Sequence, residues 1–289
     1  MTGPAWAFLP DGRRLHLQHG PTDLIIEVFA ADAVRMRAHA RAIARFRGLL
    51  AGLVRDLPAL RRPVDAGAPL ADPVARRMRD ACLPHAGVFV TPMAAVAGAI
   101  ADEILAAMVA GLPVDRAYVN NGGDVAIHLG PGQHFDAAIW DGGGGGRLRV
   151  AAGDGVGGIA TSGWRGRSHS LGIADAVTVL ARSAAAADAA ATLIANAVDL
   201  PGHPAITRRP ARMLSPDSDL GDRPVTVAVG PLAPAEVAAA LDRGLAAARD
   251  MLERGLIRGA ALFLRGETRA LGLPAPPTPR ELLPCQNSA

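Results

Sequence analysis

The fold class is clearest in residues 93–129, whose sequence is MAAVAGAIADEILAAMVAGLPVDRAYVNNGGDVAIHL. The first half, Met93 to Ala110, is almost purely small and apolar apart from Asp102 and Glu103. Its length and alanine content favour a buried helix over a strand. Two short strand-like runs follow, joined by a tight turn at Asn120–Asp124. A buried helix next to a hairpin predicts the α+β class.

Helices and strands are expected on both sides of this stretch. A strand at Leu24–Phe29 precedes an amphipathic helix between Asp32 and Leu57, or two helices broken near Gly48 or Gly52. The other expected helices are Val74–Cys82, Ala184–Val198 and Ala235–Arg254, and the other expected strands are Val88–Val90, Ala117–Val119, Val125–Leu129, Phe135–Trp140, Leu148–Ala151, one near Ile159, Ala176–Leu180, Val225–Val229 and Ala260–Leu264.

No repeat and no clean boundary divides the chain. We therefore expect one α+β domain of mixed sheets packed with helices over residues 1–271. Residues 272–289 form a Pro-rich tail that we expect to be disordered, and Gly142–Gly146 look like a mobile hairpin tip.

The composition excludes several classes of function. The chain has 289 residues, of which 50% are hydrophobic and 20% charged, which excludes disorder, collagen and coiled coil as descriptions of the whole chain. All 30 basic residues are arginine, so Schiff-base catalysis, pyridoxal phosphate attachment and a Walker A loop, which need lysine, are excluded. The 30 basic and 27 acidic residues nearly balance, and a net charge of +3 does not predict a nucleic-acid partner.

The cysteines and the N-terminal residues bear on the compartment. Cys82 and Cys285 are too few and too far apart for a disulfide framework or a zinc site. Met1–Gly20 reads as a polar leader without an apolar signal region, and no uninterrupted apolar run reaches about 18 residues. We therefore expect a cytoplasmic protein with neither a membrane span nor a membrane partner.

Most familiar catalytic motifs are missing. Gly153, Gly155 and Gly158 spell G-x-G-x-x-G, but a strand and a turn follow them where a dinucleotide-binding fold needs a helix. The chain has no G-x-S-x-G and no H-E-x-x-H motif. Three other stretches carry residues suited to chemistry.

The first stretch is the alanine-rich helix expected at Ala184–Val198. Asp188, Thr192 and Asn196 lie four residues apart and so form one row of oxygen-bearing side chains on an otherwise apolar helix. A carboxylate and a hydroxyl suit Mg²⁺ when phosphates and water complete its octahedron. Alternatively, Asp188 is stabilised by the helix dipole and Thr192 bonds back to a carbonyl.

The second stretch, Ala160–Ser170, combines hydroxyls, two arginines, a histidine and a tryptophan with flexible glycines. Arg165 and Arg167 could hold phosphate bidentately, Trp164 could stack on an aromatic ligand, and His169 could exchange a proton near neutral pH. An exposed arginine loop explains the pattern equally well. The third stretch, Asn120–Asp124, offers free amides, although a plain hairpin turn also explains it.

Together the three stretches resemble the flavin transferase superfamily, that is, the FAD:protein FMN transferases or ApbE-like proteins, and more closely its uncharacterised cytoplasmic branch. The similar blocks occur in the family's order: the N-x-G-G-D turn, the T-S-G block leading to His169, and the A-D-A-x-A-T helix. The resemblance implies a single ApbE-like domain. It implies a metal site at Asp188 and Thr192 and places His169 in the catalytic region. With the arginine loop, the candidate cofactor-binding residues are Asn121, Gly122, Gly123, Asp124, Thr161, Ser162, Gly163, Arg165 and Arg167.

The function implied is an Mg²⁺-assisted enzyme that binds FAD, FMN or a related nucleotide pyrophosphate. Two parts of the family pattern differ here: Ala97–Asp102 contains no lysine, and His169 is not followed by the family's acid, proline and threonine. A flavin-binding accessory protein for a partner redox enzyme, or an enzyme acting on another small substrate in the same cleft, therefore stays open. So does assembly into a homo-oligomer.

Overall fold

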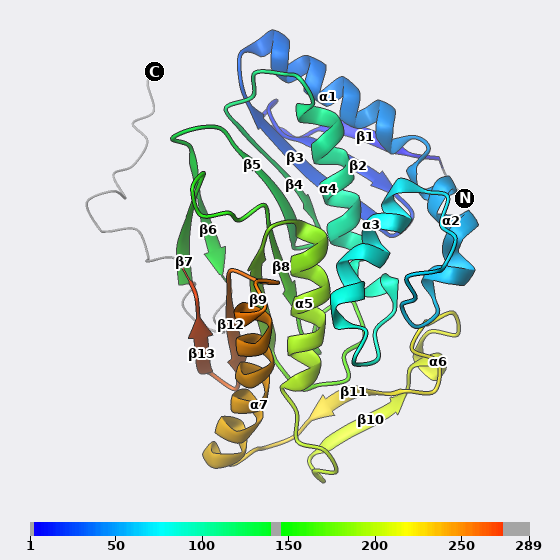
Figure 1. Ribbon diagram of the computed structural model, residues 1–289, viewed down its shortest axis with the longest axis vertical. Helices are drawn as coiled ribbons and strands as arrows, with labels where there is room; N and C mark the ends of the chain where they lie inside the picture. The colour runs from blue at the N-terminus through cyan, green and yellow to red at the C-terminus, as the bar shows by residue number, and fades with distance from the viewer. Residues whose placement is uncertain (1–2, 140–145, 274–289) are drawn as a thin grey trace.

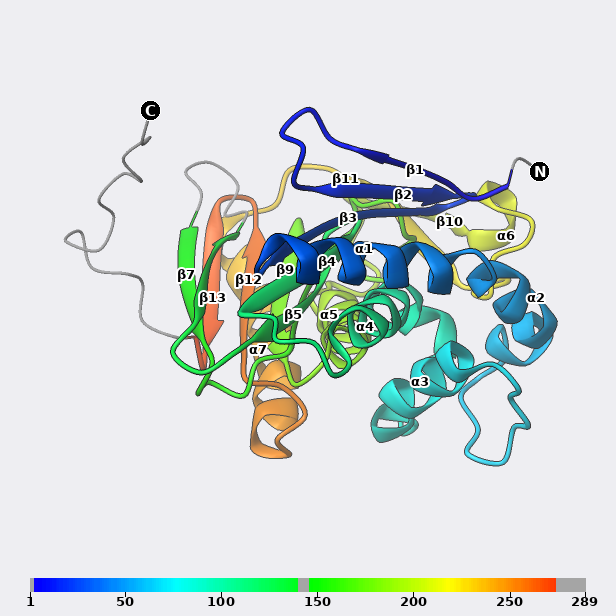
Figure 2. The same ribbon diagram turned by 90° about the horizontal axis from the view of Figure 1, so that it is seen from above.

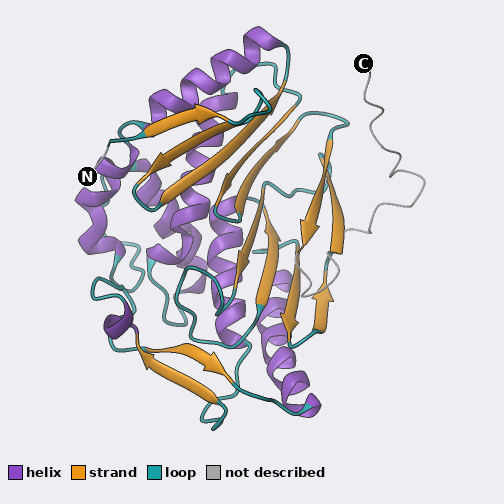
Figure 3. Ribbon diagram, turned by 180° about the vertical axis from the view of Figure 1, so that it is seen from behind, coloured by secondary structure: helices purple, strands orange, loops and turns teal. Residues whose placement is uncertain are grey.

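The computed structural model describes residues 3–139 and 146–273. Its main feature is a nine-stranded sheet of order β1-β2-β3-β4-β5-β8-β9-β12-β13 (Figures 1 and 3). Every neighbouring pair in it is antiparallel. Its strands are β1 (Ala5–Phe8), β2 (Leu15–His19), β3 (Thr22–Phe29), β4 (Arg116–Asn121), β5 (Asp124–Leu129), β8 (Gly158–Ser162), β9 (Ala176–Ala181), β12 (Gly259–Leu264) and β13 (Glu267–Leu271).

The helices gather on one face of this sheet, as the view from above shows (Figure 2). Two separate hairpins pair β6 (His134–Ile139) with β7 (Gly146–Ala151) and β10 (Ile206–Pro210) with β11 (Pro224–Val229). The helices are α1 (Asp32–Phe46), α2 (Leu49–Leu60), α3 (Pro73–Cys82), α4 (Val96–Val109), α5 (Ala184–Ala197), α6 (Ala211–Leu214) and α7 (Pro234–Glu253), with 3-10 turns η1 (Leu83–His85) and η2 (Pro92–Ala95).

Alternate residues of the central strands face two separate cores. On β8, Ala160 belongs to the large core under the helices, while the preceding Ile159 packs with Leu148 and Val150 of the β6–β7 hairpin on the opposite face. Side chains of a strand point to alternate faces, so a central strand covered on both sides is apolar at successive positions. The site lies among elements packed against the first core.

Helices α4 and α5 pack closely because small residues line their contact. A Cβ placed on Gly98 of α4 would lie 2.3 Å from the carbonyl oxygen of Ala184, and one on Gly158 of β8 would lie 2.1 Å from the Ala184 nitrogen. Only glycine permits this approach at either position. The small residues seen in the sequence therefore bring α4, α5 and β8 together at the start of α5.

The α+β class is confirmed, and most expected elements are present. The helix expected between Asp32 and Leu57 is two helices, with the break at Gly48. The expected mixture of parallel and antiparallel strands is wrong, because every described strand pairing is antiparallel. The strand expected at Val88–Val90 is wrong. Val88 is exposed and its amide donates back to His85, and the Val90 carbonyl accepts one bond, from the Val64 amide, so the segment forms no strand.

The expected polar leader is also wrong, because Met1–Gly20 contributes β1 and β2. Leu15 and Leu17 are fully buried on alternate positions of β2. The strands β10 and β13 and the short helix α6 were not expected. The hairpin expected around Gly142–Gly146 is present as β6 and β7, but residues 140–145 lie outside the described residues, as do residues 274–289 of the expected tail.

Within residues 3–139 and 146–273, one helical segment is long and apolar enough to cross a membrane, judged by length and composition alone. This segment, Pro92–Val109, has 18 residues with a mean hydropathy of 1.6, and 56% of the segment is buried inside the protein. In the structure it is η2 and α4, and α4 packs against α1, α5 and β4. A core helix meets such a test as readily as a membrane helix does.

Candidate functional site

The three stretches singled out in the sequence meet at one cleft of about 360 Å³. The β4–β5 turn, the loop after β8 and one side of α5 line it together with the start of α4. Of the candidate residues, those on the cleft are Asn121, Gly122, Asp124, Thr161, Ser162, Gly163, Arg165, Arg167, Asp188 and Thr192. Segments far apart in the chain thus supply one site.

The β4–β5 turn owes its shape to two glycines and two asparagines. Gly122 and Gly123 have φ angles of 66° and 116°, which side chains rarely adopt. The Asn120 side chain accepts a hydrogen bond from the Gly123 amide at 2.9 Å, and the buried Asn121 amide donates to the carbonyl of Ala97 at 3.1 Å. The turn is a hairpin turn, as one interpretation held, but Asn121 also anchors it to the N-terminus of α4.

Asp124 and Asp188 place two carboxylates at the same end of the cleft. An oxygen of Asp124 accepts the Thr161 amide at 3.3 Å, and an oxygen of Asp188 accepts the Gly98 amide at 3.0 Å. Burial raises the pKa of Asp124 to about 7, although Thr161 and Arg167 act in the opposite direction. Burial and the neighbouring Asp124 raise the pKa of Asp188 well above its ordinary value. Without a nearby cation, the site therefore disfavours the ionised form of both carboxyls.

This donor set fits a magnesium ion. Two enclosed carboxylates need a cation nearby to remain ionised, and carboxylate oxygens are the ligands that Mg²⁺ prefers. Thr192 also faces the cleft, and none of the hydrogen bonds in the described part of the chain joins its hydroxyl to a backbone carbonyl. No group of three or more His, Cys, Asp or Glu side chains suited to a metal occurs among residues 3–139 and 146–273. Any bound Mg²⁺ would thus keep several positions for water or phosphate.

Arg167 is the cation nearest the β4–β5 turn. A Cβ on Gly122 would lie 2.2 Å from its Nη2, so the guanidinium lies directly over that glycine. Its positive charge lowers the pKa of Asp124, though less than burial raises it. Among the described residues it forms no ion pair, which leaves its donors available to a phosphate.

Arg165 is already committed to a protein carboxylate. Its Nε donates to Asp175 at 3.1 Å, and Trp164 donates to the same oxygen at 3.3 Å. The Arg165 guanidinium also lies 5.0 Å from the centre of the Trp164 ring. Trp164 does not line the cleft. The sequence suggested that Trp164 could stack on a ligand. In the structure the ring packs against Arg165 instead.

Three candidates lie away from the cleft lining. Gly123 shapes the turn without facing the cleft. His169 hydrogen-bonds through Nε2 to the Ser215 hydroxyl at 3.0 Å, beyond α6. Asn196, the last member of the predicted row on α5, accepts hydrogen bonds from the Ser170 hydroxyl and the Leu171 amide. Asn196 therefore holds the chain after His169, while Asp188 and Thr192 face the cleft.

Sequence reasoning missed the groups that hold the site in place. Asp175 binds Trp164 and Arg165 and also accepts the Arg265 amide at 2.7 Å. The start of α4 supplies the amide that meets Asp188. The glycine at Gly98 was a usable signal, since a glycine within a buried helix marks a close backbone approach. Asp175 carried no distinguishing pattern.

A family model described as "AbpE bacteria" matches residues 6–270. The chain belongs to this family. The match covers the whole sheet apart from the ends of β1 and β13, and it confirms the ApbE-like resemblance drawn from the three motifs. Assignment to a cytoplasmic branch stays a prediction.

Two curated relatives are UPF0280 proteins of archaea. That of Methanothrix thermoacetophila is 40% identical over 141 residues, which are 47% of this chain and 56% of the relative. That of Methanopyrus kandleri is 38% identical over 182 residues, which are 61% of this chain and 70% of the relative. The chain thus spans little more than half the length of the first, and neither name states an activity.

Two solved structures are similar over nearly the whole chain. The ApbE protein of Thermotoga maritima has a TM-score of 0.47 and 14% identity, and it covers 89% of this chain and 96% of its own. The apo form of the flavinyl transferase ApbE of Pseudomonas stutzeri has a TM-score of 0.49 and 13% identity, covering 94% of both chains. These identities are too low to transfer the role of any residue.

Proposed function

We propose that the cleft binds Mg²⁺ together with the pyrophosphate of FAD or a related nucleotide, and that the protein is an Mg²⁺-assisted enzyme acting on that pyrophosphate. The observation that carries the proposal is the pair Asp124 and Asp188. Burial raises the pKa of both groups, so keeping both carboxylates ionised at neutral pH needs a cation in the cleft. A divalent cation held by these carboxylates would keep them ionised and would attract a pyrophosphate.

When bound, Mg²⁺ would neutralise phosphate oxygens and favour displacement at phosphorus. Asp124, Asp188 and Thr192 would hold the ion from the β4–β5 turn and from α5. Arg167, which lies over Gly122, would donate to phosphate oxygens of the ligand. Asp175 would keep the Arg165 loop in place while the ligand binds.

The lining also indicates which part of a ligand is recognised. No aromatic side chain is among the residues on this cleft in the described part of the chain. Hydroxyls, carboxylates, arginines and glycines form it instead. These groups suit a charged phosphate group better than a flavin ring, so the cleft would select the pyrophosphate.

A second candidate is a flavin-binding accessory protein without catalysis. It is favoured by the placement of His169, which bonds to Ser215 and is not on the cleft. The cleft then supplies metal and phosphate contacts but no histidine to carry a proton to or from the substrate.

The test measures binding and chemistry separately. FAD is titrated calorimetrically with Mg²⁺ or with EDTA, and release of FMN and AMP is followed chromatographically. We expect Mg²⁺-dependent FAD affinity that Asp124→Asn abolishes. Asp217→Asn, at a side chain that is 91% exposed, is the matched control and should change nothing. Equal affinity with Mg²⁺ and with EDTA would contradict the proposal, and tight binding without FMN release would favour the accessory protein.

A further inference from the structure

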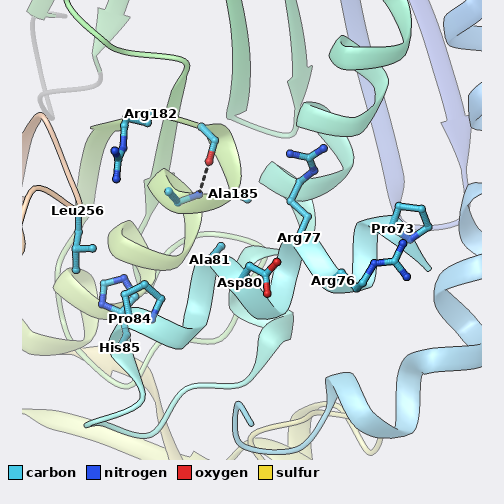
Figure 4. Close-up of a pocket in the computed structure, with 12 residues that line it drawn as sticks. Pro73, Arg76, Arg77, Asp80, Ala81, Pro84, His85, Arg182, Ala185 and Leu256 are labelled. Atoms are coloured by element: carbon cyan, nitrogen blue, oxygen red, sulfur yellow. Dashed lines mark hydrogen bonds between the residues drawn. The ribbon is translucent and has the colours of Figure 1, made fainter. Parts of the chain in front are cut away.

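A second cavity, of about 530 Å³, lies between α3, the beginning of α5 and the loop after α7 (Figure 4). It shares no lining residue with the cleft described above. Nothing in the proposed function uses it.

Positive charge dominates the lining of this second cavity. Arg76 and Arg77 reach it from α3, and Arg182 reaches it from the residue pair before α5. The one acidic side chain on the lining is Asp80, which is paired with Arg79 at 2.8 Å. An anion entering the cavity would therefore meet three guanidinium groups, of which Arg77 alone has a carboxylate partner, Glu103, among the described residues.

Two of these arginines have unused donors. Arg182 is exposed and makes no side-chain hydrogen bond or ion pair within the described residues. Arg77 reaches Glu103 only at 3.4 Å, and its Nε is enclosed without a partner in that part of the chain. The donors of Arg182 are open to a ligand oxygen, while the enclosed Arg77 Nε leaves that side chain with hydrogen-bonding capacity that the protein does not satisfy.

His85 supplies a separate indication of a ligand. Only 6% of this residue is exposed, it lines the cavity, and its ring has no hydrogen-bond partner among residues 3–139 and 146–273. Burial and the nearby Arg254 lower its pKa, so the ring is neutral near pH 7 and can donate one hydrogen bond. Buried polar side chains are normally paired, so this ring is suited to a ligand oxygen.

The first amides of α5 are already hydrogen-bonded within the protein, so this helix end offers a ligand only the electrostatic field of its dipole. The Ala184 and Ala185 amides donate to Asp102, and the Ala186 amide donates to Ser183. A ligand in the cavity would therefore depend on side chains. The positive end of the helix still favours an anion nearby.

We propose that this cavity is a second binding site, for a small phosphate monoester. Arg77 from α3 and Arg182 from the residues before α5 hold the phosphate, and His85 donates to one of its oxygens. The rest of the lining is polar at Arg76, Asp80 and Ser183 and apolar elsewhere. Its apolar side chains, which include Ala81, Pro84 and Leu256, accommodate the body of the molecule. The volume exceeds that of inorganic phosphate, which is why an ester fits better than the free ion.

Calorimetric titration of the full chain tests this, with ribose 5-phosphate, inorganic phosphate and succinate as probes at constant ionic strength in EDTA. EDTA keeps divalent cations out of the first cleft. We expect ribose 5-phosphate to bind most tightly. Arg182→Gln should weaken its binding about tenfold and Arg182→Glu should weaken it further, because each removes a charge-assisted contact at a position without protein partners.

Two control variants test whether the loss of binding is specific to this cavity. Arg243→Gln removes an exposed arginine on α7 and should leave binding unchanged. Arg167→Gln alters the first cleft and should also leave it unchanged. No saturable binding of ribose 5-phosphate up to about 10 mM would overturn the proposal. So would binding that Arg182→Glu leaves intact, binding lost only in Arg167→Gln, or tighter binding of succinate.

Discussion

Replacing Asp124 by asparagine should stabilise the metal-free protein at neutral pH and remove its response to Mg²⁺. In the unfolded chain this carboxyl has a pKa of 3.8, and in the folded, metal-free protein burial raises the pKa to about 7. Between these values the folded state holds a proton that the unfolded state has released. The free energy of unfolding therefore falls as the pH rises from about 4 to about 7, and it levels off above that.

The size of the effect follows from the same two values. Each pKa unit corresponds to about 1.36 kcal/mol, so the difference amounts to about 4 kcal/mol at pH 8. Asparagine has a similar shape, can still accept the Thr161 amide and does not titrate. The variant should thus equal the parent near pH 4 and exceed it by up to about 4 kcal/mol at pH 8 in EDTA.

Urea unfolding followed by tryptophan fluorescence at several pH values, in EDTA or Mg²⁺, measures this difference. Burial lowers the pKa of His39 and His85, so these residues act in the opposite sense, with stability lost as the pH falls. They are present in both proteins and cancel in the comparison. Asp188 does not cancel, because loss of the Asp124 charge lowers its pKa, and this change further favours the variant at high pH. In Mg²⁺ at about 100 times its Kd, the parent should gain about 2.7 kcal/mol and the variant almost nothing. A variant no more stable than the parent at pH 8 in EDTA would show that Arg167 already balances the carboxylate, and the reasoning would fail.

Three further predictions concern the same cleft. Gly122→Ala should cost about 1 kcal/mol of stability, seen as a lower urea midpoint, because φ is 66° there and Arg167 must move; an unchanged midpoint would contradict this. Arg167→Gln should weaken Mg²⁺-dependent FAD binding about tenfold by calorimetry, whereas Arg165→Gln should weaken it less because Arg165 is paired with Asp175; equal losses would refute the distinction. His169→Asn should leave FAD affinity within a few-fold, and if turnover is found, a loss of about 10²–10⁴-fold would show that His169 reaches the substrate.

The residues that line the cleft were more predictable from the sequence than the residues, such as Asp175, that hold them in place. Asp188 and Thr192 are one helical turn apart on α5, so their common face follows from helix periodicity alone. The turn at Asn120–Asp124 follows from its two glycines. Their meeting in space depends on the order of strands in the sheet, which no local pattern encodes. Asn196 shows where helix periodicity fails as a guide to the site. It lies in the same row as Asp188, but its side chain bonds to Ser170 and Leu171 and does not line the cleft.

The strands that sequence reasoning missed have a different cause. β2 alternates buried leucines with histidine and glutamine, which is a strand pattern too short and too polar to stand out in a charged N-terminal region. β1 is exposed at all four positions and exists because β2 offers it an edge. The opposite error at Val88–Val90 arose because β-branched residues favour a strand only where a neighbouring strand can pair.

Helices α4 and α5 cap one another, and this sets how the cleft can be altered. Asp102 of α4 accepts the amides of Ala184 and Ala185 at the start of α5, and Asp188 of α5 accepts the Gly98 amide at the start of α4. The two carboxylates have equivalent structural tasks, but only Asp188 also faces the cleft. Asp102 contributes to stability without access to a ligand.

Asp188 therefore serves structure and ligand binding with one side chain. Its contact with Gly98 fixes the carboxylate where two helices meet, so the oxygens face the cleft without any loop having to order them. Removing the carboxylate leaves the start of α4 without its acceptor, and a loss of stability in Asp188→Ala would not separate the two tasks. Asp124 begins strand β5 and caps no helix, so substitution there reports on the charge of the cleft itself.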